Sequence, residues 1–506
     1  QFTAAATAGQ LSFTAPTKTY GGSALSGELT YHVYVNTDAP LTGKVNAGSS
    51  AVVPVQAREG MNTFVVTLTN AAGASPKARL SAYAGYDTPK SVDKRTLSVD
   101  AARRADLTWT APSATEHGGF LGALTYDLIR ITGTDTTQVA NGISDVHFAE
   151  VLPEGPLMGY RYAVRAHNQS QVTTWTNSNN AVVGSPIEPP FFDEFANAAD
   201  AELYTVIDNN NDQASWAWDK DPYTEQTAYR YHWSDTEKAD DWLLLPPLRL
   251  RAGKVYTFQF KAKSNGTDYT ERFEVKWGQA PNPAGLSTVI LNPTEVSTDE
   301  YQTFTNELRP QADGTYYIGF HALSDAGGYY LHIDSVSIAA PVAAAAPAAA
   351  ENLKGKADPS GKLLTTLTFD APKLKVDGTA LSNIERIEVR NGIRLVKAFT
   401  QPTPGASLTA TDNRATTGDN VYTVIAFNAD GAGATATKTI YVGQDHPATP
   451  VIAAEDLSNA VRLTWPAVGG ANGGLVIPEE VTYNIYNVRD GGYRGDLIAT
   501  VTGGKT

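Results

Sequence analysis

The stretch "LTWTAP" at residues 107–112 decides the fold, because related stretches occur three more times along the chain. They read "LSFTAP" at 11–16, "LTFDAP" at 367–372 and "LTWPAV" at 463–468. The first two copies are about 96 residues apart, as are the last two, whereas the middle interval is about 260 residues. Self-similarity at a fixed period indicates repeated structural units. The long interval therefore predicts one repeat plus an insert of about 164 residues.

Each copy is followed by a turn or polar loop and then by a segment that alternates apolar with polar residues. These segments read "ELTYHVYVN", "ALTYDLIRI", "IERIEVRNG" and "EVTYNIYNV". Such alternation, rich in Val, Ile, Thr and Tyr, is typical of a half-buried antiparallel strand. Strands that return every 8–12 residues or so between turn signals favour a β-sandwich of about 100 residues for each repeat.

The repeats resemble fibronectin type III modules, which have a core Trp on an early strand and a late strand of the form Tyr-x-Val-x-Ala-x-Asn. The likeness rests on Trp109 and Trp465, replaced by Phe13 and Phe369 in the other copies, and on the late strands Tyr162–Asn168 and Tyr422–Asn428. The first copy departs from the pattern, with Phe64 and Leu68 at the Tyr and Ala positions. The fourth copy reaches Thr506 before a late strand appears, so we expect it to be incomplete and the chain to be an excerpt.

The insert, from about 191 to 338, has longer and more aromatic strand patterns. They read "KVYTFQFKAKS" at 254–264, "ERFEVKWG" at 271–278, "TYYIGFHALS" at 315–324 and "YYLHIDSVSI" at 329–338. Two alternating faces that bury against each other predict a sandwich of the jelly-roll type.

The order of motifs in the insert resembles the cleaved-adhesin domains of gingipains and the related choice-of-anchor and MAM-like jelly rolls. The stretches that carry this likeness are "FFDEF" at 191–195, "YTVIDNNNDQASWAW" at 204–218, "DDWLLLPPLRLRAGKVYTFQFKAKS" at 240–264 and the closing "YYLHIDSVSI". The resemblance implies a non-catalytic, exported domain that often carries calcium and is commonly joined to fibronectin type III modules. It implies adhesion or accessory binding rather than proteolysis.

We therefore predict an all-β fold, with tandem fibronectin type III β-sandwiches and an intervening jelly-roll β-sandwich. The predicted domains are 1–87, 88–187, 188–342, 343–446 and the partial 447–506. Two linkers are expected to frame the insert, "SPIEPP" at 185–190 and "AAPVAAAAPAAAEN" at 339–352, because their prolines and small residues favour extended backbone over a long helix.

The most aromatic stretch of the insert is "SWAWDKDPYTEQTAYRYHWSD" at 215–235. Its candidate ligand-binding residues are Trp216, Trp218, Tyr223, Tyr229, Tyr231 and Trp233. Rings two residues apart on a strand point to the same face. They are either the core of a sandwich that has no disulfide or a platform for a sugar ring or a partner protein. We expect most of them in the core, with Tyr223 on the polar loop and one or two neighbours in contact with a ligand.

Two sets of oxygen-bearing side chains are candidate calcium ligands, because calcium prefers carboxylate and amide oxygens on turns. The first set is Asp208, Asn210 and Asp212 in "IDNNND". An EF-hand is not expected, since Gln213 replaces the sixth-position Gly and Asp219 replaces the final Glu. The second set pairs Asp193 or Glu194 with Asp334, because the opening and closing strands of a jelly roll can lie side by side. The alternative for both is that these carboxylates cap turns or face water.

Composition excludes several classes of function. The chain has 506 residues, a net charge of −14 and no cysteine, so it has no disulfides and no cysteine nucleophile. Nucleic acid is not an expected partner, because phosphate binding depends on Lys and Arg. No apolar run approaches the roughly 18–20 residues that cross a bilayer. We expect a monomer.

The motifs that mark common enzyme families are absent from the sequence, including His-Glu-x-x-His, Gly-x-Ser-x-Gly and the P-loop. Paired carboxylates for sugar hydrolysis remain open, because their separation is set by the fold. The tripeptide Arg-Gly-Asp at 494–496 is taken as a chance match rather than an integrin ligand, since it falls early in its repeat.

The function expected from the sequence is that of a non-catalytic, adhesin-like binding protein at the cell surface or outside the cell. The jelly roll would bind an extracellular protein or a glycan. Two alternatives stay open: an accessory carbohydrate-binding region of a larger glycan-degrading or peptidase protein, and a structural spacer of the cell surface.

Overall fold

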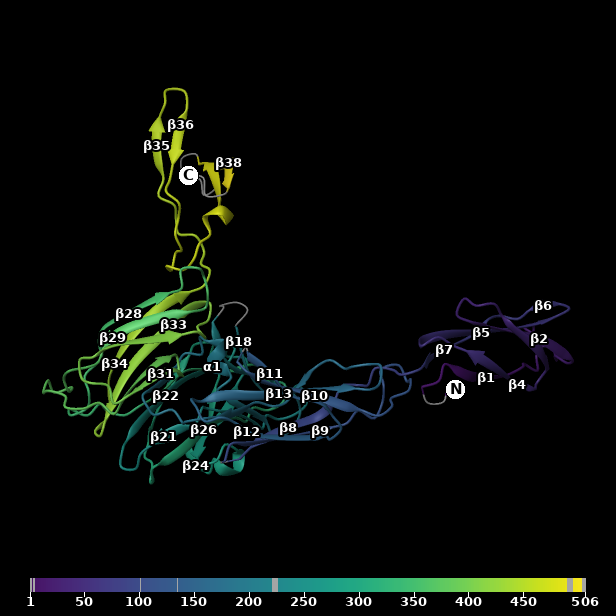
Figure 1. Cartoon of the computed structure of the whole chain (residues 1–506), viewed down its shortest axis with the longest axis horizontal. Helices are drawn as coiled ribbons and strands as arrows, with labels where there is room; N and C mark the ends of the chain where they lie inside the picture. The colour runs from purple at the N-terminus through teal and green to yellow at the C-terminus, as the bar shows by residue number, and fades with distance from the viewer. Residues whose placement is uncertain are drawn as a thin grey trace. The chain divides into compact units, whose positions relative to one another are not determined.

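The computed structural model describes residues 2, 5–100, 102–133, 135–220, 226–488 and 495–502. They form an all-β protein of 38 strands with one short α-helix, α1 (Ala198–Ala201), and two 3-10 turns, Pro283–Gly285 and Pro478–Glu480 (Figure 1). This confirms the predicted fold class. The chain divides into two compact units, 1–154 with 158–183 and 155–157 with 184–506, which are described separately below. No described helix has the length and apolar character needed to cross a lipid bilayer.

The first unit begins with a sandwich that we call module one. One sheet pairs β1 (Ala8–Thr14) with β4 (Ser50–Gln56). The other has the order β3 (Leu41–Asn46), β2 (Glu28–Val35), β5 (Gly60–Asn70) and β6 (Gly73–Ala74), with β7 (Ala78–Ala84) also on β5. The strand residues that point inward, among them Leu11, Val33, Val53 and Phe64, form the core between the sheets.

Module two completes the first unit. One sheet has the order β12 (His147–Val151), β9 (Arg104–Thr110) and β8 (Asp93–Val99). The other has the order β11 (Asp135–Ile143), β10 (Thr125–Thr132), β13 (Met158–His167) and β14 (Thr176–Asn177), with β15 (Ala181–Val183) on β13. Trp109 of the repeated motif is buried and meets the Tyr126 ring edge-on at 5.2 Å. The motif therefore marks a core position.

In the second unit, a larger central sandwich precedes modules three and four. Its first sheet has the order β18 (Trp216–Lys220), β19 (Thr227–Tyr231), β27 (Leu331–Ala339), β22 (Tyr256–Lys263) and β25 (Gln302–Leu308), with β16 (Phe191–Asp193) on β27. Its second has the order β17 (Thr205–Asp208), β20 (Asp241–Leu244), β26 (Gly314–Ala322), β23 (Glu271–Gly278) and β24 (Thr288–Val296), with β21 (Leu248–Leu250) on β26. Phe258, Phe260, Phe273 and Phe320 are fully buried between the sheets.

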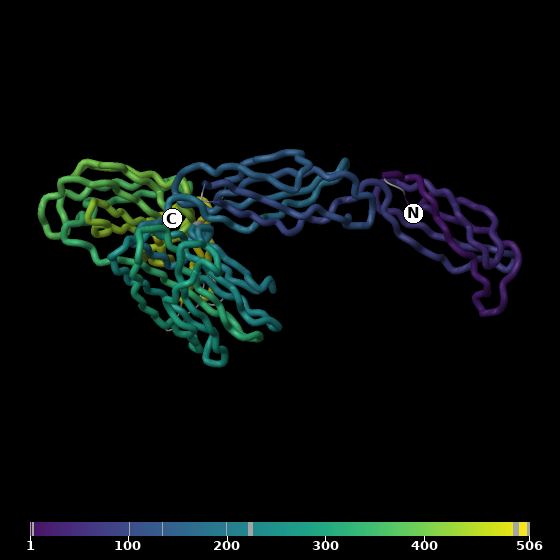
Figure 2. The backbone as a smooth tube through the Cα atoms, turned by 90° about the horizontal axis from the view of Figure 1, so that it is seen from below, coloured from purple at the N-terminus to yellow at the C-terminus, as the bar shows by residue number. Residues whose placement is uncertain are grey.

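Module three repeats the plan of modules one and two. One sheet is β28 (Glu351–Ala357), β29 (Thr365–Asp370) and β32 (Ser407–Asp412). The other is β31 (Arg394–Thr400), β30 (Arg386–Asn391), β33 (Gly418–Asn428) and β34 (Gly431–Val442). The Ala/Pro stretch that the sequence suggests as a linker lies partly against this module, because Asn428 donates to the Ala345 carbonyl at 3.0 Å and Ala346 is buried. Figure 2 follows the backbone through these strands.

Module four consists, in its described residues, of two two-stranded sheets, β35 (Ala453–Asp456) with β36 (Val461–Thr464) and β37 (Thr482–Asn487) with β38 (Asp496–Thr502). A groove of about 800 Å³ lies between them, lined by apolar residues that include Leu463, Trp465 and Ile485. These are core positions of the repeat, so we read the groove as an open core rather than as a ligand site.

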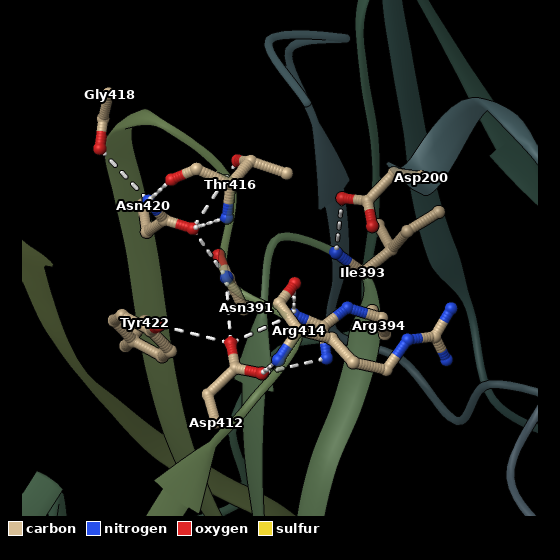
Figure 3. Close-up of polar contacts among 10 residues, drawn as sticks. All are labelled: Asp200, Asn391, Ile393, Arg394, Asp412, Arg414, Thr416, Gly418, Asn420 and Tyr422. Atoms are coloured by element: carbon tan, nitrogen blue, oxygen red, sulfur yellow. Dashed lines mark hydrogen bonds and ion pairs between the residues drawn. The ribbon is translucent and has the colours of Figure 1, made fainter. Parts of the chain in front are cut away.

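A buried polar network holds module three together (Figure 3). Asp412 accepts from Arg394 at 3.1 and 2.8 Å, from the Asn391 amide at 3.0 Å and from the Tyr422 hydroxyl at 3.0 Å. Burial alone would raise the pKa of Asp412, but the hydrogen bonds and charge of Arg394 outweigh burial and lower it. The Asp412 carboxylate therefore stays charged inside the module.

Modules one and three share an asparagine pair at the end of this network. In module three the Asn391 amide donates to the Asn420 oxygen at 2.8 Å, and Asn420 donates to the carbonyls of Thr416 and Gly418. In module one Asn36 donates to Asn62 at 2.8 Å, and Asn62 donates to the carbonyls of Arg58 and Gly60. The same side chains close the same turn in both modules.

Within the second unit, module three contacts the segment that leads into the central sandwich. Arg390 donates to the carbonyls of Pro190 at 2.7 Å and Glu188 at 2.9 Å. The Glu188 carboxylate pairs with Arg386 of module three at 2.7 Å and with Arg251 of the central sandwich at 2.8 Å. A further contact joins the same two parts, because the buried Asp200 accepts from the Ile393 amide at 3.3 Å (Figure 3). Charge-assisted hydrogen bonds of this kind are stronger than neutral ones.

Candidate functional site

The aromatic stretch forms the hairpin β18–β19, in which Trp216 lies opposite Tyr231 and Trp218 opposite Tyr229. The alternation of the sequence thus places these rings in register. Trp216, Tyr229 and Tyr231 are buried, with only 4% of Trp216 exposed, and Tyr229 packs against Phe195 at 5.1 Å. Half-buried Trp218 donates to the Phe195 carbonyl at 2.7 Å. These four rings lie in the core or at its edge, as predicted for most of the stretch. Tyr223 lies outside the described residues, as does Arg494 of the Arg-Gly-Asp tripeptide.

Trp233, just after β19, belongs instead to a cluster of partly exposed rings. Its ring centre is 4.5 Å from that of Tyr329 and 5.1 Å from that of Tyr330. Tyr269 stacks on Tyr329, with the ring centres 4.9 Å apart, and is 39% exposed. We call Trp233, Tyr269, Tyr329 and Tyr330 the aromatic patch. Three separate loops supply it, so alternation along any one strand does not predict it.

Charged groups flank the aromatic patch. The Arg230 guanidinium lies 4.7 Å from the centre of the Tyr330 ring and pairs with Asp219. The Tyr329 amide donates to the Glu271 carboxylate at 2.6 Å, which fixes the loop that carries Tyr329 and Tyr330. The patch therefore combines partly exposed rings with a loop backbone held by a carboxylate, an arrangement suited to binding with little loss of side-chain freedom.

A group of neighbouring buried oxygens has no hydrogen-bond partner in the described part of the chain, and one member, Glu271, also holds the patch through the Tyr329 amide. These oxygens are Asp212 Oδ2, Asp241 Oδ1, Glu271 Oε2 and the hydroxyls of Ser215 and Tyr231. Burial raises the pKa of Asp241 to about 7; the nearby Ser215 hydroxyl opposes this shift, and the charges of Asp208 and Asp212 add to it. Buried polar atoms are normally satisfied, so a group of orphaned oxygens needs an explanation.

The first predicted calcium set lies at the edge of this buried group. Asp208 accepts from the amides of Asp212 at 3.3 Å and Gln213 at 3.0 Å, so its carboxylate closes the loop. Asn210 turns away and donates to the Lys238 carbonyl at 2.9 Å. Asp212 directs one oxygen to the Ala214 amide and leaves the other without a partner. Sequence reasoning missed Asp241, which the pairing of β17 with β20 places opposite Asp208.

The second predicted set lies where β16 pairs with β27, with Asp193 opposite Val336. Buried Asp193 accepts from the Phe195 amide at 2.8 Å and the Tyr204 hydroxyl at 2.7 Å. Its pKa is raised to about 6, mainly by burial, with smaller contributions from the charges of Asp334 and Glu194. The opening and closing strands do lie side by side, but both Asp193 oxygens already have donors.

The described ranges contain no group of three or more His, Asp or Glu side chains arranged to hold a metal ion. A cation bound in the group of buried oxygens would therefore need hydroxyl or carbonyl oxygens in addition to the Asp212 and Asp241 carboxylates. Oxygen-only sets of this kind suit calcium, which takes six to eight hard ligands. The donor set present fits calcium in its chemistry.

Neither a protein-family model nor a curated protein matches the chain. Solved structures that resemble part of it include the K1 cleaved-adhesin domain of Lys-gingipain from Porphyromonas gingivalis W83, at 19% identity, 30% of this chain, 97% of that chain and a TM-score of 0.25. The K3 domain of the same protein matches at 16% identity over 29% of this chain and 98% of that chain, with a TM-score of 0.25. The CBM22-1 xylan-binding domain of Xyn10C from Paenibacillus barcinonensis matches at 8% identity over 32% of this chain and 99% of that chain, with a TM-score of 0.23.

Proposed function

We propose that the central sandwich is a non-catalytic binding domain whose ligand, a glycan or an extracellular protein, contacts the aromatic patch. The observation that carries this proposal is the convergence of four partly exposed rings from three loops onto one surface. Flat rings with an apolar face and a polar edge supply much contact area at low entropic cost, which is why Tyr and Trp are frequent at binding surfaces.

We further propose that calcium binds in the group of buried oxygens and stabilises the loops that carry the patch. Asp212 and Asp241 would hold the ion, with the Tyr231 and Ser215 hydroxyls close by. A bound cation would compensate the carboxylates whose burial is otherwise unfavourable. Since Glu271 in the same group accepts from the Tyr329 amide, loss of the cation would also loosen the patch.

We also propose that the remaining modules are fibronectin type III-like sandwiches that hold this binding domain in an exported, monomeric surface protein. Under the alternative proposal, the whole chain is a spacer and the aromatic patch has no ligand. The two proposals differ in one measurable property, the affinity of the patch.

The test is a glycan and extracellular-protein binding array with the whole chain in calcium, compared with Tyr329→Ala and Tyr269→Ala. Each substitution removes exposed ring area, so we expect about a tenfold or greater loss of affinity for the bound ligand, or about 1.4 kcal/mol. Tyr20→Ala is the matched control, because Tyr20 is 96% exposed on module one, outside the patch. Unchanged binding by the patch variants would reject the site, and absence of any ligand would favour the spacer.

A further inference from the structure

The passage from module one to module two is made without a free linker. β7 ends at Ala84, and the next carbonyl, Gly85 O, already accepts from the Phe120 amide of module two at 3.1 Å. The Asp87 backbone amide then donates to the Phe120 carbonyl at 3.0 Å. The Asp87 carboxylate accepts from the His117 amide at 2.7 Å and the Gly119 amide at 3.1 Å. Thus the segment leaving module one is bound at once by the loop between β9 and β10.

The passage from module three to module four has the same hydrogen bonds. The Gly443 carbonyl accepts from the Leu475 amide at 2.9 Å, and the Asp445 backbone amide donates to the Leu475 carbonyl at 2.8 Å. The Asp445 carboxylate accepts from the Asn472 amide at 2.7 Å and the Gly474 amide at 3.1 Å. The two segments read "YAGYDTP" at 83–89 and "YVGQDHP" at 441–447, so they share Tyr, Gly, Asp and Pro in the same spacing.

A glycine in each receiving loop makes room for the incoming segment. A Cβ on Gly119 would lie 2.5 Å from the Tyr83 ring and 2.7 Å from the Asp87 Cβ. A Cβ on Gly474 would lie 2.5 Å from the Tyr441 ring and 2.8 Å from the Asp445 Cβ. Real side chains do not approach so closely, so only glycine fits at this position. In each case the Tyr belongs to the last strand of the preceding module, which ties that strand to the next module.

Module three shows what happens when the receiving glycine is absent. Its loop has Thr379 at this position, as the positive φ of Gly378 (84°) shows by comparison with Gly118 (77°) and Gly473 (86°). The carboxylate that binds the Thr379 amide at 2.9 Å comes from Asp377 of the loop itself. The segment that lies against this loop carries Ala345 where the others carry Asp. The Asp carboxylate and the receiving glycine are therefore present between modules one and two and between modules three and four. At the loop of module three, a contact within the loop replaces them.

We propose that the β9–β10 loop of module two and the corresponding loop of module four are receiving surfaces specific for a Tyr-x-Gly-x-Asp-x-Pro segment. This contact fixes module two to module one, and module four to module three. Tyr fills the space over the receiving glycine, and Asp binds two amides of the loop. The Gly of the segment adopts the positive φ that the turn between the modules needs, 86° at Gly85 and 89° at Gly443. The Pro follows where the chain enters the next module.

The test uses spin labels, because the chain has no cysteine and accepts two new ones without background. Ser12→Cys in module one with Thr108→Cys in module two reports the first passage, since both positions are exposed on strands. Double electron–electron resonance on the whole chain should give one narrow distance distribution. Gly119→Ala and Asp87→Ala should each widen that distribution at least about twofold, because one pushes Tyr83 away and the other removes the carboxylate.

Gly118→Ala is the control from the same loop, since a Cβ there meets nothing within 4 Å; its φ of 77° adds backbone strain but no contact with the incoming segment. It should leave the distance distribution narrow. The second passage is tested in the same way with Thr366→Cys and Thr464→Cys and the variant Gly474→Ala. A broad distance distribution in the spin-labelled chain without a loop substitution would overturn the proposal. Equal widths for the Gly118→Ala and Gly119→Ala variants would do the same. Circular dichroism of each variant separates local release from unfolding.

Discussion

At the scale of single residues, two buried carboxylates show opposite solutions to the same problem. A buried charge is costly unless donors surround it. Asp412 has Arg394, Asn391 and Tyr422 as donors, so its pKa is lowered and it stays charged. Asp241 has one oxygen without a donor, so burial raises its pKa. The Asp412 carboxylate is thus compensated within the fold, whereas the Asp241 carboxylate is not.

Asp412→Ala should destabilise module three by about 3–5 kcal/mol, because it leaves the Arg394 guanidinium buried without its carboxylate. The measurement is the free energy of unfolding from urea denaturation. Asp38→Ala, which breaks an exposed pair with Arg58, is the control and should cost at most about 1 kcal/mol. Similar losses for the two variants would show that burial of the Asp412 network adds nothing.

The pH dependence of Asp412 follows from its lowered pKa. A carboxyl whose folded-state pKa is depressed contributes stability above its unfolded value of about 3.9, and that stability is lost as the pH falls through the folded pKa. We therefore expect the unfolding midpoint of wild-type module three to fall steeply below about pH 4. Asp412→Ala should lose this part of the acid transition, as measured by calorimetry between pH 2 and pH 6 or so.

For Asp241 the expected dependence of stability on pH has the opposite sign. Because its folded-state pKa is raised to about 7, the folded state favours the proton, and stability falls as the pH rises from about 4 to about 7. Without calcium, Asp241→Asn should remove that loss and raise the unfolding midpoint at pH 8. With calcium, the wild type should gain stability and the variant should not. A calcium response that survives in Asp241→Asn would contradict the proposed cation site.

At the scale of elements, strands are predictable from sequence and convergent loops are not. The expected strand at 271–278 is β23 itself, and the rings of 216–231 pair as their alternation requires. Trp233 is among the candidates from sequence, but its neighbours Tyr269 and Tyr329 are not, because the three rings come from three loops whose meeting depends on the order of strands in two sheets. Asp241 escapes prediction for the same reason, since only the β17–β20 pairing brings it to Asp208.

The turn between β30 and β31 offers an element-scale prediction. A Cβ on Gly392, which has φ of 56°, would lie 2.1 Å from Asp200 Oδ2. Gly392→Ala should therefore both strain the turn and break the contact with the central sandwich. Gly378→Ala is the control, because its φ is also positive but a Cβ there meets nothing within 4 Å. In thermal melts the control should cost about 1–2 kcal/mol and Gly392→Ala clearly more.

At the scale of the whole molecule, Arg390 and Glu188 join two domains that the sequence presents as separate. About 200 positions lie between these residues, and nothing in local composition predicts their contact. Because Arg390 is buried and binds two carbonyls of the entering segment, the central sandwich and module three should unfold together. Calorimetry of the whole chain should show one shared transition for them, which Arg390→Ala splits into two. Two transitions already in the wild type would contradict the coupling.

The shared asparagine pair of modules one and three has a consequence for descent. These two modules also carry Phe13 and Phe369 in the repeated motif, whereas modules two and four carry Trp109 and Trp465. Modules one and three are thus alike, as are modules two and four. The same connecting segment joins module one to module two and module three to module four. Duplication of a two-module block would leave this alternation, whereas repeated copying of one module would not. The alternation is therefore the pattern expected of a two-module block that was copied as a unit.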